Sequence, residues 1–226
     1  MSFHVYASLE QGSESWHAAR RGIITASVVG QFITAKTIKV AANVEARSMM
    51  AQLVAERITG HVEETFGSRD MENGHFFEPI ARDLYSEQHA PAVEVGFMVR
   101  DDWGFRLGYS PDGVVGDDGL IEIKSRKQKI QLKTILADEV PAENMAQIQT
   151  GLLVSGRDWL DYVSYCGGLP LYVKRVLPDP RWHAAIIEAV AAFEETATQM
   201  IATYEAATDG LPLTERIDPY EEMELS

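Results

Sequence analysis

The stretch SPDGVVGDDGLIEIK, residues 110–124, holds three side chains whose types and spacing suit metal-dependent chemistry. Glu122 and Lys124 lie two positions apart in a short apolar run, and side chains two apart on a strand project to the same face. Asp112 precedes them across a turn, so antiparallel pairing would bring it beside Glu122. The alternative is that all three are ordinary surface charges on a hairpin, because Glu-x-Lys alone is a weak signal.

Two neighbouring carboxylates repel each other unless a cation lies between them. Oxygen ligands of this kind suit Mg²⁺ or Mn²⁺, with the Ile123 carbonyl as a further oxygen. A bound metal lowers the pKa of a coordinated water and stabilises charge on a phosphate. We expect Lys124 to position or deprotonate that water, or to stabilise the developing charge. The pattern therefore predicts hydrolysis of a phosphodiester.

The charge of the chain is unevenly distributed. A net charge of −14 argues against a protein that coats nucleic acid indiscriminately, because such binding needs basic surface. From Glu188 onward the chain has ten acidic residues and one basic residue, whereas residues 124–133, KSRKQKIQLK, have five basic residues and no acidic one. A polyanionic ligand is therefore compatible with the composition if the fold separates these charges.

The hydrophobic pattern predicts one α/β domain over residues 1–207, with a central mixed β-sheet flanked by helices, and an acidic C-terminal tail over 208–226. Pro79 lies inside one helical pattern and is expected to kink that helix or to begin its second part. Helices are predicted over 13–22, 40–60, 142–156 and 180–207 and after Ser68, and a short helix or turn over 25–33. Strands are predicted over 93–100, 105–110 and 119–126, with a hairpin around Gly167 and Gly168.

The expected location is the cytoplasm, without membrane association. The N-terminus has no basic start followed by an apolar run, and no apolar stretch approaches the roughly 20 residues that span a bilayer. The lone Cys166 cannot form an internal disulfide and is expected in the core.

Further motifs strengthen the nuclease interpretation. WHAARRGIITAS (16–27), GHFFEP (74–79) and MAQIQ (145–149), together with SPDG and EIK, resemble the motifs of the lambda-type phage exonucleases. These enzymes are the YqaJ-like group of the PD-(D/E)xK nuclease superfamily. Four motifs in the right order are more specific than one hairpin, and the resemblance covers most of the chain.

The resemblance implies a restriction-endonuclease-like core and a Mg²⁺-dependent exonuclease acting on double-stranded DNA. It implies that one strand is degraded from the 5′ end, which leaves 3′ single-stranded overhangs for homologous recombination. It also implies a ring-shaped homotrimer, a single-strand annealing protein as partner, and a phage or prophage gene in a bacterial host.

The resemblance also assigns residues. Glu78 would be the helical carboxylate that joins Asp112, Glu122 and the Ile123 carbonyl at the metal. Lys124 would be the catalytic lysine, with Gln147 beside it to hold the attacking water or the phosphate.

A second set of residues is expected to bind DNA. Arg20 and Ser27 match the positions that bind the 5′-terminal phosphate, in keeping with the strength of guanidinium and hydroxyl donors toward phosphate. Arg126, Lys127 and Lys129, in the basic run, are expected to contact the DNA backbone.

Purely structural roles for these residues remain alternatives at this point. Glu78 and Gln147 can be polar positions on amphipathic helices, Arg20 a charge near a helix C-terminus, and the basic run a solvated face. Two other functions compete with the exonuclease. One is a structure-specific or restriction-type endonuclease on the same core, and the other is a non-catalytic DNA-end-binding module or acidic DNA mimic.

Overall fold

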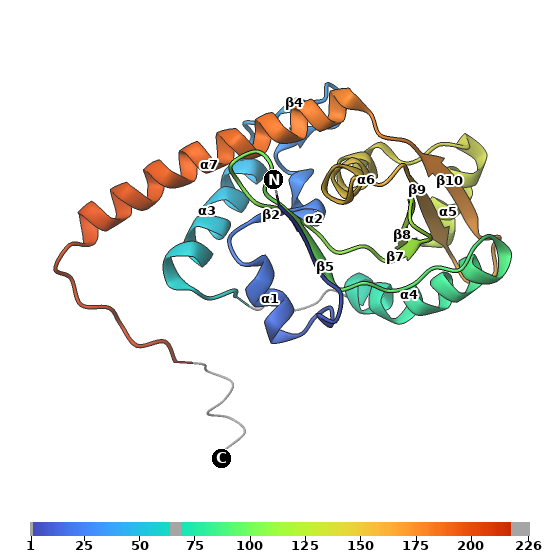
Figure 1. Cartoon of the computed structure of the whole chain (residues 1–226), viewed down its shortest axis with the longest axis horizontal. Helices are drawn as coiled ribbons and strands as arrows, with labels where there is room; N and C mark the ends of the chain where they lie inside the picture. Colours follow the sequence, from blue (N-terminus) through green and yellow to red (C-terminus); the bar gives the residue numbers. More distant parts are fainter. Residues whose placement is uncertain (1, 64–68, 218–226) are drawn as a thin grey trace, which may run out of the picture.

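The computed structural model of the chain describes residues 2–63 and 69–217, without the side chains of 69–73. Within these residues, helices are interspersed with strands along the chain, and the long helix α7 crosses the top of the molecule (Figure 1). The described helices are α1 (Glu14–Arg20), α2 (Ala26–Val29), α3 (Val44–Thr59), α4 (Arg69–Gln88), α5 (Gln128–Ala137), α6 (Ala142–Ser155) and α7 (Pro180–Thr208).

The predicted central sheet divides into two four-stranded sheets, both mixed in direction. One has the order β1-β5-β6-β2 and the other β10-β9-β8-β7, and a two-stranded ribbon, β3-β4, lies apart from them. Residues 110–112 connect β6 to β7, and a bridge between Val93 and Val114 joins the sheets again. The strands are β1 (Phe3–Tyr6), β2 (Ile24–Thr25), β3 (Ile33–Thr34), β4 (Lys39–Val40), β5 (Phe97–Arg100), β6 (Leu107–Tyr109), β7 (Gly113–Val115), β8 (Gly119–Ser125), β9 (Trp159–Tyr165) and β10 (Tyr172–Val176).

The alternation along β8 sorts its side chains between two cores. Ile121 and Ile123 pack with Ala81 and Tyr85 of α4, whereas Leu120 belongs to the larger core that includes α6 and α7. This arrangement confirms the prediction that the two isoleucines pack behind the charged pair. It leaves the Glu122 and Lys124 side chains on the face of β8 opposite α4.

Most predicted elements are confirmed, with shorter bounds for some strands. The glycines expected to end α3 and α6 do so, because Gly60 and Gly156 adopt the left-handed conformation (φ 66° and 70°) that favours glycine. The hairpin around Gly167 and Gly168 is β9–β10, and α7 begins with Pro180 in its first turn. The helix after Ser68 runs through Pro79 as one assigned element.

The helix α5 was not predicted, and neither were the strands β1, β2, β3, β4 and β7. In α5, Gln131 and Thr134 are buried while Ile130, Leu132 and Leu136 are exposed, so the helix reverses the usual amphipathic pattern. The strand β1 has four exposed residues and is a strand because it pairs with β5, a contact that its own sequence does not signal. None of the described helices is long and apolar enough to cross a membrane.

The packing of α6 on β6 generates a stability prediction. A Cβ added at Gly151 of α6 would lie 2.7 Å from Cζ of the buried Tyr109 ring. Because overpacking of this kind costs about 1–3 kcal/mol, we expect Gly151→Ala to lower the melting temperature by several degrees. Gly30→Ala is the matched control, since its Cβ would meet the Ala146 Cβ at an ordinary 3.6 Å. Equal melting temperatures of the two variants, measured by calorimetry, would contradict the prediction.

Candidate active site

The Glu122 carboxylate is the most deeply buried charge of the site, with 1% of its side chain exposed. It accepts hydrogen bonds from the Lys124 ammonium at 2.7 Å, from the Gln147 amide and from the Tyr109 hydroxyl at 3.3 Å. A buried carboxylate is unfavourable unless it is paired and hydrogen-bonded, and three donors from β6, β8 and α6 meet that need. Glu122 is therefore not a surface charge, and Gln147 lies where it was predicted.

Asp112 lies immediately before β7, at the position that the strand register places opposite Glu122. Its Oδ2 accepts a hydrogen bond of 2.6 Å from the backbone N–H of Ile123. The strand β7 begins only at Gly113. The Asp112 side chain therefore accepts the hydrogen bond from Ile123 that the backbone of a neighbouring strand would otherwise accept. The N–H and C=O of one strand residue point to the same side, so the Ile123 carbonyl also faces this side of β8.

Glu78 reaches the site from α4 and is held by Arg82, one helical turn later. The Arg82 guanidinium donates to Glu78 at 2.5 Å, to the Asp112 backbone carbonyl at 2.6 Å and to Glu94 at 2.8 Å. A cavity of about 180 Å³ opens beside Glu78, lined also by His75 and Arg82. Glu78 is thus not a solvated helix charge. Arg82 was not predicted, although its i+4 spacing from Glu78 is a signal that sequence offers.

Burial and neighbouring carboxylates raise the pKa of Asp112 and of Glu78. Burial raises the pKa of Asp112 well above the usual aspartate range, and the charges of Glu122 and Glu78 raise it further. Burial also raises the pKa of Glu78, and Arg82 only partly opposes this effect. For Lys124, burial acts to lower the pKa, but Glu122 and Asp112 together outweigh it and the pKa is raised. In this arrangement Lys124 is therefore a cation and a hydrogen-bond donor.

The donor set fits a hard divalent cation. Asp112, Glu122, Glu78 and the Ile123 carbonyl offer oxygen atoms alone, which suits Mg²⁺ or Mn²⁺, and a cation among them would relieve the repulsion that raises the pKa of Asp112. In the part of the chain that the structure describes, no three His, Cys, Asp or Glu side chains are already arranged to hold a metal ion. Coordination by all three carboxylates therefore requires their side chains to move closer to one another.

A second cluster surrounds Arg20 at the end of α1. Its guanidinium donates to the hydroxyls of Ser27 at 3.0 Å, Ser110 at 3.2 Å and Thr25 at 3.3 Å. It also lies 3.9 Å above the centre of the Trp16 ring, whose indole N–H donates to Ser110. Burial lowers the pKa of Arg20 to about 10, although the charge of Glu56 opposes this. A guanidinium among hydroxyls offers hydrogen-bond donors of the kind that suit a phosphate group.

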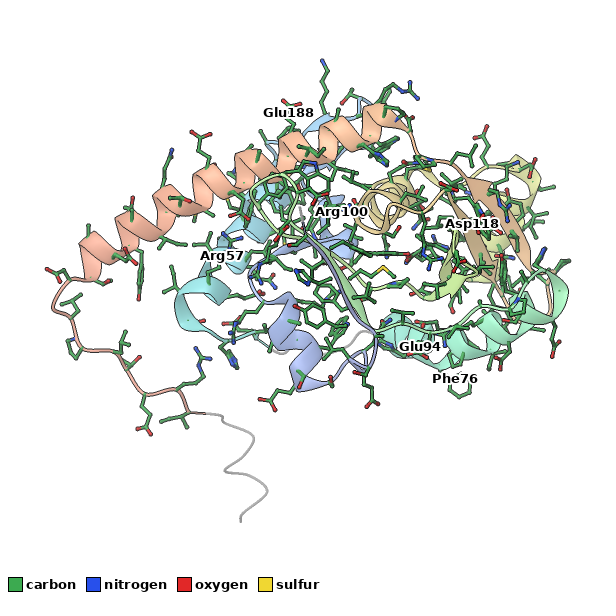
Figure 2. All side chains as sticks on the ribbon, viewed as in Figure 1. Arg57, Phe76, Glu94, Arg100, Asp118 and Glu188 are labelled. Carbon is green, nitrogen blue, oxygen red and sulfur yellow. The ribbon has the colours of Figure 1, made fainter. Side chains whose placement is uncertain are left out.

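The turn after Arg20 is held by α3 and α7. The backbone N–H of Gly22 donates to Glu56 at 2.8 Å, and the Gly22 carbonyl accepts from Arg57. Arg57 also binds both carboxylate oxygens of Glu194 in α7 at 2.7 Å, and Figure 2 shows it between the two helices. Gly22 itself needs to be glycine, because its φ is 65° and a Cβ would lie 2.5 Å from Arg57. Two distant helices therefore position Arg20.

The structure brings Arg20 and Ser27 together as predicted, and it adds Thr25 and Ser110. Both additions lie inside the motifs that carried the resemblance, ITAS and SPDG, and this is the signal that would have found them. Ser110 is two residues before Asp112, so the two clusters are joined by a short stretch of chain.

The three predicted DNA-binding residues of the basic run differ in how deeply they are buried. The Arg126 guanidinium is half-buried and donates to Asn144 and to the Tyr162 hydroxyl, so it braces the start of α6. Lys127 and Lys129 are exposed at the start of α5. Contact of these three residues with DNA stays a prediction.

Comparison with known proteins agrees with this geometry. The model of the YqaJ-like viral recombinase domain matches residues 15–158. The structure is similar to the crystal structure of an alkaline exonuclease (LHK-Exo) from Laribacter hongkongensis, at a TM-score of 0.78 and 32% identity, over 88% of this chain and 100% of that one. The same protein in complex with dAMP gives the same values. No curated protein sequence matches significantly.

A third solved structure, a phage-related exonuclease from Haemophilus somnus 129PT, matches at a TM-score of 0.59 and 15% identity, over 80% of this chain and 96% of that one. At this identity it shows a shared fold alone. The predicted nuclease fold class and the predicted resemblance to lambda-type exonucleases are confirmed by the domain model and by the Laribacter structure.

Charge repulsion at Asp112 generates a testable prediction. We expect Asp112→Asn to raise the melting temperature of the metal-free protein by a few degrees, because it removes one repelling charge and keeps an acceptor for the Ile123 N–H. The same change should abolish the stabilisation that Mg²⁺ confers on the wild type. Thermal unfolding with and without Mg²⁺ tests both statements.

The control is Asp83→Asn, the same chemical change at an exposed position of α4. It should leave both the metal-free melting temperature and the Mg²⁺ response unchanged. A Mg²⁺-induced shift that survives in Asp112→Asn would place the cation elsewhere.

Proposed function

Because the chain belongs to the YqaJ-like viral recombinase family, we propose that it is a Mg²⁺-dependent exonuclease of double-stranded DNA that degrades one strand from the 5′ end. The products would be 3′ single-stranded overhangs for homologous recombination. The observation that carries the proposal is the buried Glu122, held by Lys124 and Gln147 beside Asp112. The Laribacter protein, whose whole chain is matched, is described as an alkaline exonuclease.

The residues have distinct roles in this reaction. Asp112, Glu122, Glu78 and the Ile123 carbonyl would hold Mg²⁺, which polarises a phosphate oxygen and stabilises the charge that develops on it. Lys124 donates to a phosphate oxygen and adds a positive charge that is in place before the reaction begins. Gln147 and Tyr109 hold Glu122 in a single orientation.

The Arg20 cluster supports action from an end. A terminal phosphate carries more charge than an internal one and would bind the guanidinium and the surrounding hydroxyls. Since Ser110 belongs to this cluster and Asp112 to the carboxylates, a bound terminal phosphate would lie at a constant offset from the hydrolytic groups. An endonuclease has no need of such a pocket, and a DNA mimic has no need of a buried Glu122.

Assembly and partners follow from the same family. We propose a homotrimeric ring threaded by DNA, a single-strand annealing protein as partner, and action in the cytoplasm of the bacterial host of a phage or prophage. An enclosed ring accounts for the net charge of −14, because basic residues can face the DNA while acidic ones face outward. Arg126, Lys127 and Lys129 are candidates for contact with the DNA backbone.

The chemistry is tested by Lys124→Ala on linear duplex DNA labelled separately at each end. We expect degradation that EDTA abolishes and that the substitution slows by about 100-fold or more, because one donor to the developing charge is lost. Melting temperatures are measured in parallel, since Glu122 loses a partner. Lys36→Ala, at an exposed position, should retain full activity.

Closed circular DNA separates the competing functions. An exonuclease leaves it intact, whereas cutting of the circle would establish the endonuclease. Linear DNA that survives every divalent metal would leave the binding module or mimic as the function.

End recognition is tested by Arg20→Lys on duplexes with 5′-phosphate or 5′-hydroxyl ends. We expect the rate on phosphorylated ends to fall by about 10- to 100-fold, because a charge-assisted donor fork contributes about 1.5–3 kcal/mol. The rate on hydroxyl ends should change little. The neighbouring Arg21→Lys is the control, since Arg21 is exposed and donates to the Gly60 carbonyl. Equal losses on both kinds of end would contradict a phosphate pocket.

A further inference from the structure

The outward face of α5 combines leucines with lysines. Lys129, Leu132, Lys133 and Leu136 follow helical i, i+3, i+4, i+7 spacing, and all four are exposed. Leu132 is 52% exposed and Leu136 76% exposed. A surface helix ordinarily turns its leucines toward the core, so this stripe is an apolar, basic face with no cover from the described chain.

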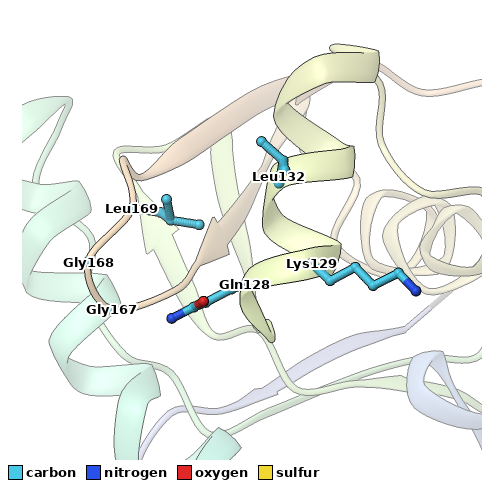
Figure 3. Close-up of a pocket in the computed structure, with 6 residues that line it drawn as sticks. All are labelled: Gln128, Lys129, Leu132, Gly167, Gly168 and Leu169. Carbon is cyan, nitrogen blue, oxygen red and sulfur yellow. The ribbon is translucent and has the colours of Figure 1, made fainter.

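A hollow lies beside this stripe. It has a volume of about 520 Å³ and lies between the first turns of α5 and the turn joining β9 to β10 (Figure 3). Leu132 and Leu169 supply apolar walls, Lys129 stands at its edge, and Gly167 and Gly168 add no side chains. The hollow suits an apolar side chain that carries acidic neighbours.

The segment after α7 has that composition. In residues 209–217, the apolar side chains Leu211, Leu213 and Ile217 are 63%, 89% and 65% exposed, and the charged residues of the segment are Asp209, Glu215 and Arg216. The sequence beyond it adds four acidic residues, namely Asp218, Glu221, Glu222 and Glu224. Residues 209–226 together have six acidic residues and one basic residue, so the sequence of the tail is acidic whereas the stripe on α5 is basic.

The geometry separates these two surfaces within one chain. Helix α7 has 29 residues, about 43 Å at 1.5 Å each, and it carries the tail to the end of the molecule opposite α5 (Figure 1). Nine residues, 209–217, extend at most about 30 Å. Residues 211–217 therefore cannot return to α5 of their own chain.

We propose that residues 211–217 of one copy dock on the α5 face of a second copy. One of the tail leucines fills the hollow between Leu132 and Leu169, and the acidic side chains of the tail lie against Lys129 and Lys133. The interaction buries leucines on both sides and pairs opposite charges across them. It goes beyond the nuclease function and does not depend on it.

The test mixes two single-cysteine variants of the full chain, Leu132→Cys and Leu213→Cys, one of them carrying a size tag, under mild oxidation without DNA. We expect a disulfide-linked heterodimer on a non-reducing gel. A Val44→Cys variant replaces Leu132→Cys in the control mixture, because Val44 is equally exposed on α3. The control should give at least 10-fold less heterodimer. The native Cys166 is buried and is the same in every sample.

Charge reversal provides the second arm. Lys129→Glu with Lys133→Glu, added to Leu132→Cys, should lower the heterodimer yield by at least 10-fold, whereas Lys36→Glu with Lys39→Glu should not. The proposal would be overturned if the mixture of Leu132→Cys and Leu213→Cys gave no more heterodimer than the control mixture with Val44→Cys. The proposal would also be overturned if the double variant Leu132→Cys/Leu213→Cys formed an internal disulfide while the two single variants formed no heterodimer. That result would show that the α5 face binds the tail of its own chain.

DNA is the competing occupant of the α5 face. Because Lys129 is also a candidate for contact with the DNA backbone, the readout that decides is the cross-link: a heterodimer yield that Lys129→Glu with Lys133→Glu leaves unchanged would overturn the proposal. Nuclease assays on the Leu132→Cys and Leu213→Cys variants, which keep both lysines, separate the two questions, since absent cross-linking with intact degradation leaves the proposed function standing.

Discussion

The burial of carboxylate charge is the constraint on which the site depends. Glu122 lies almost wholly out of water, and its charge is tolerated because Lys124, Gln147 and Tyr109 donate to it from β8, α6 and β6. The same contacts tie these three elements together, so the fold and the site are stabilised by one set of interactions. Burial raises the pKa of Asp112, and the charges of Glu122 and Glu78 raise it further; this repulsion is the part of the balance that a cation would relieve.

A second consequence concerns the two clusters, the carboxylates around Asp112 and the donors around Arg20. The stretch from Ser110 to Asp112 carries at one end a hydroxyl that accepts a hydrogen bond from Arg20 and at the other end a carboxylate. Arg57 links the turn after Arg20 to Glu194, so α7 supports the proposed phosphate pocket although it contributes no side chain to it. Under the proposed function, the groups that recognise an end and those that hydrolyse a bond would be held by connected elements.

Part of this could be predicted from sequence because it depends on local spacing. The period-two pattern of residues 119–125 placed Glu122 and Lys124 on one face, and glycine past a helix end located the ends of α3 and α6. Helix α5 escaped prediction because its leucines face outward and Gln131 faces inward, where the Ser164 and Pro170 carbonyls accept from it. Periodicity assumes that apolar residues face the core, and this helix violates the assumption.

The sequence by itself determined the kinds of chemistry: oxygen ligands, a lysine, a guanidinium with hydroxyls, and the nuclease family whose motifs they form. Only the tertiary structure decided which residues form hydrogen bonds with these groups. Arg82 reaches the Asp112 carbonyl across 30 residues, and Ser110 reaches Arg20 across 90. Such contacts depend on how sheets and helices pack, and packing is set by the whole chain rather than by spacing within a motif. Local sequence patterns therefore predict the reacting groups, whereas the tertiary structure determines which residues contact and orient them.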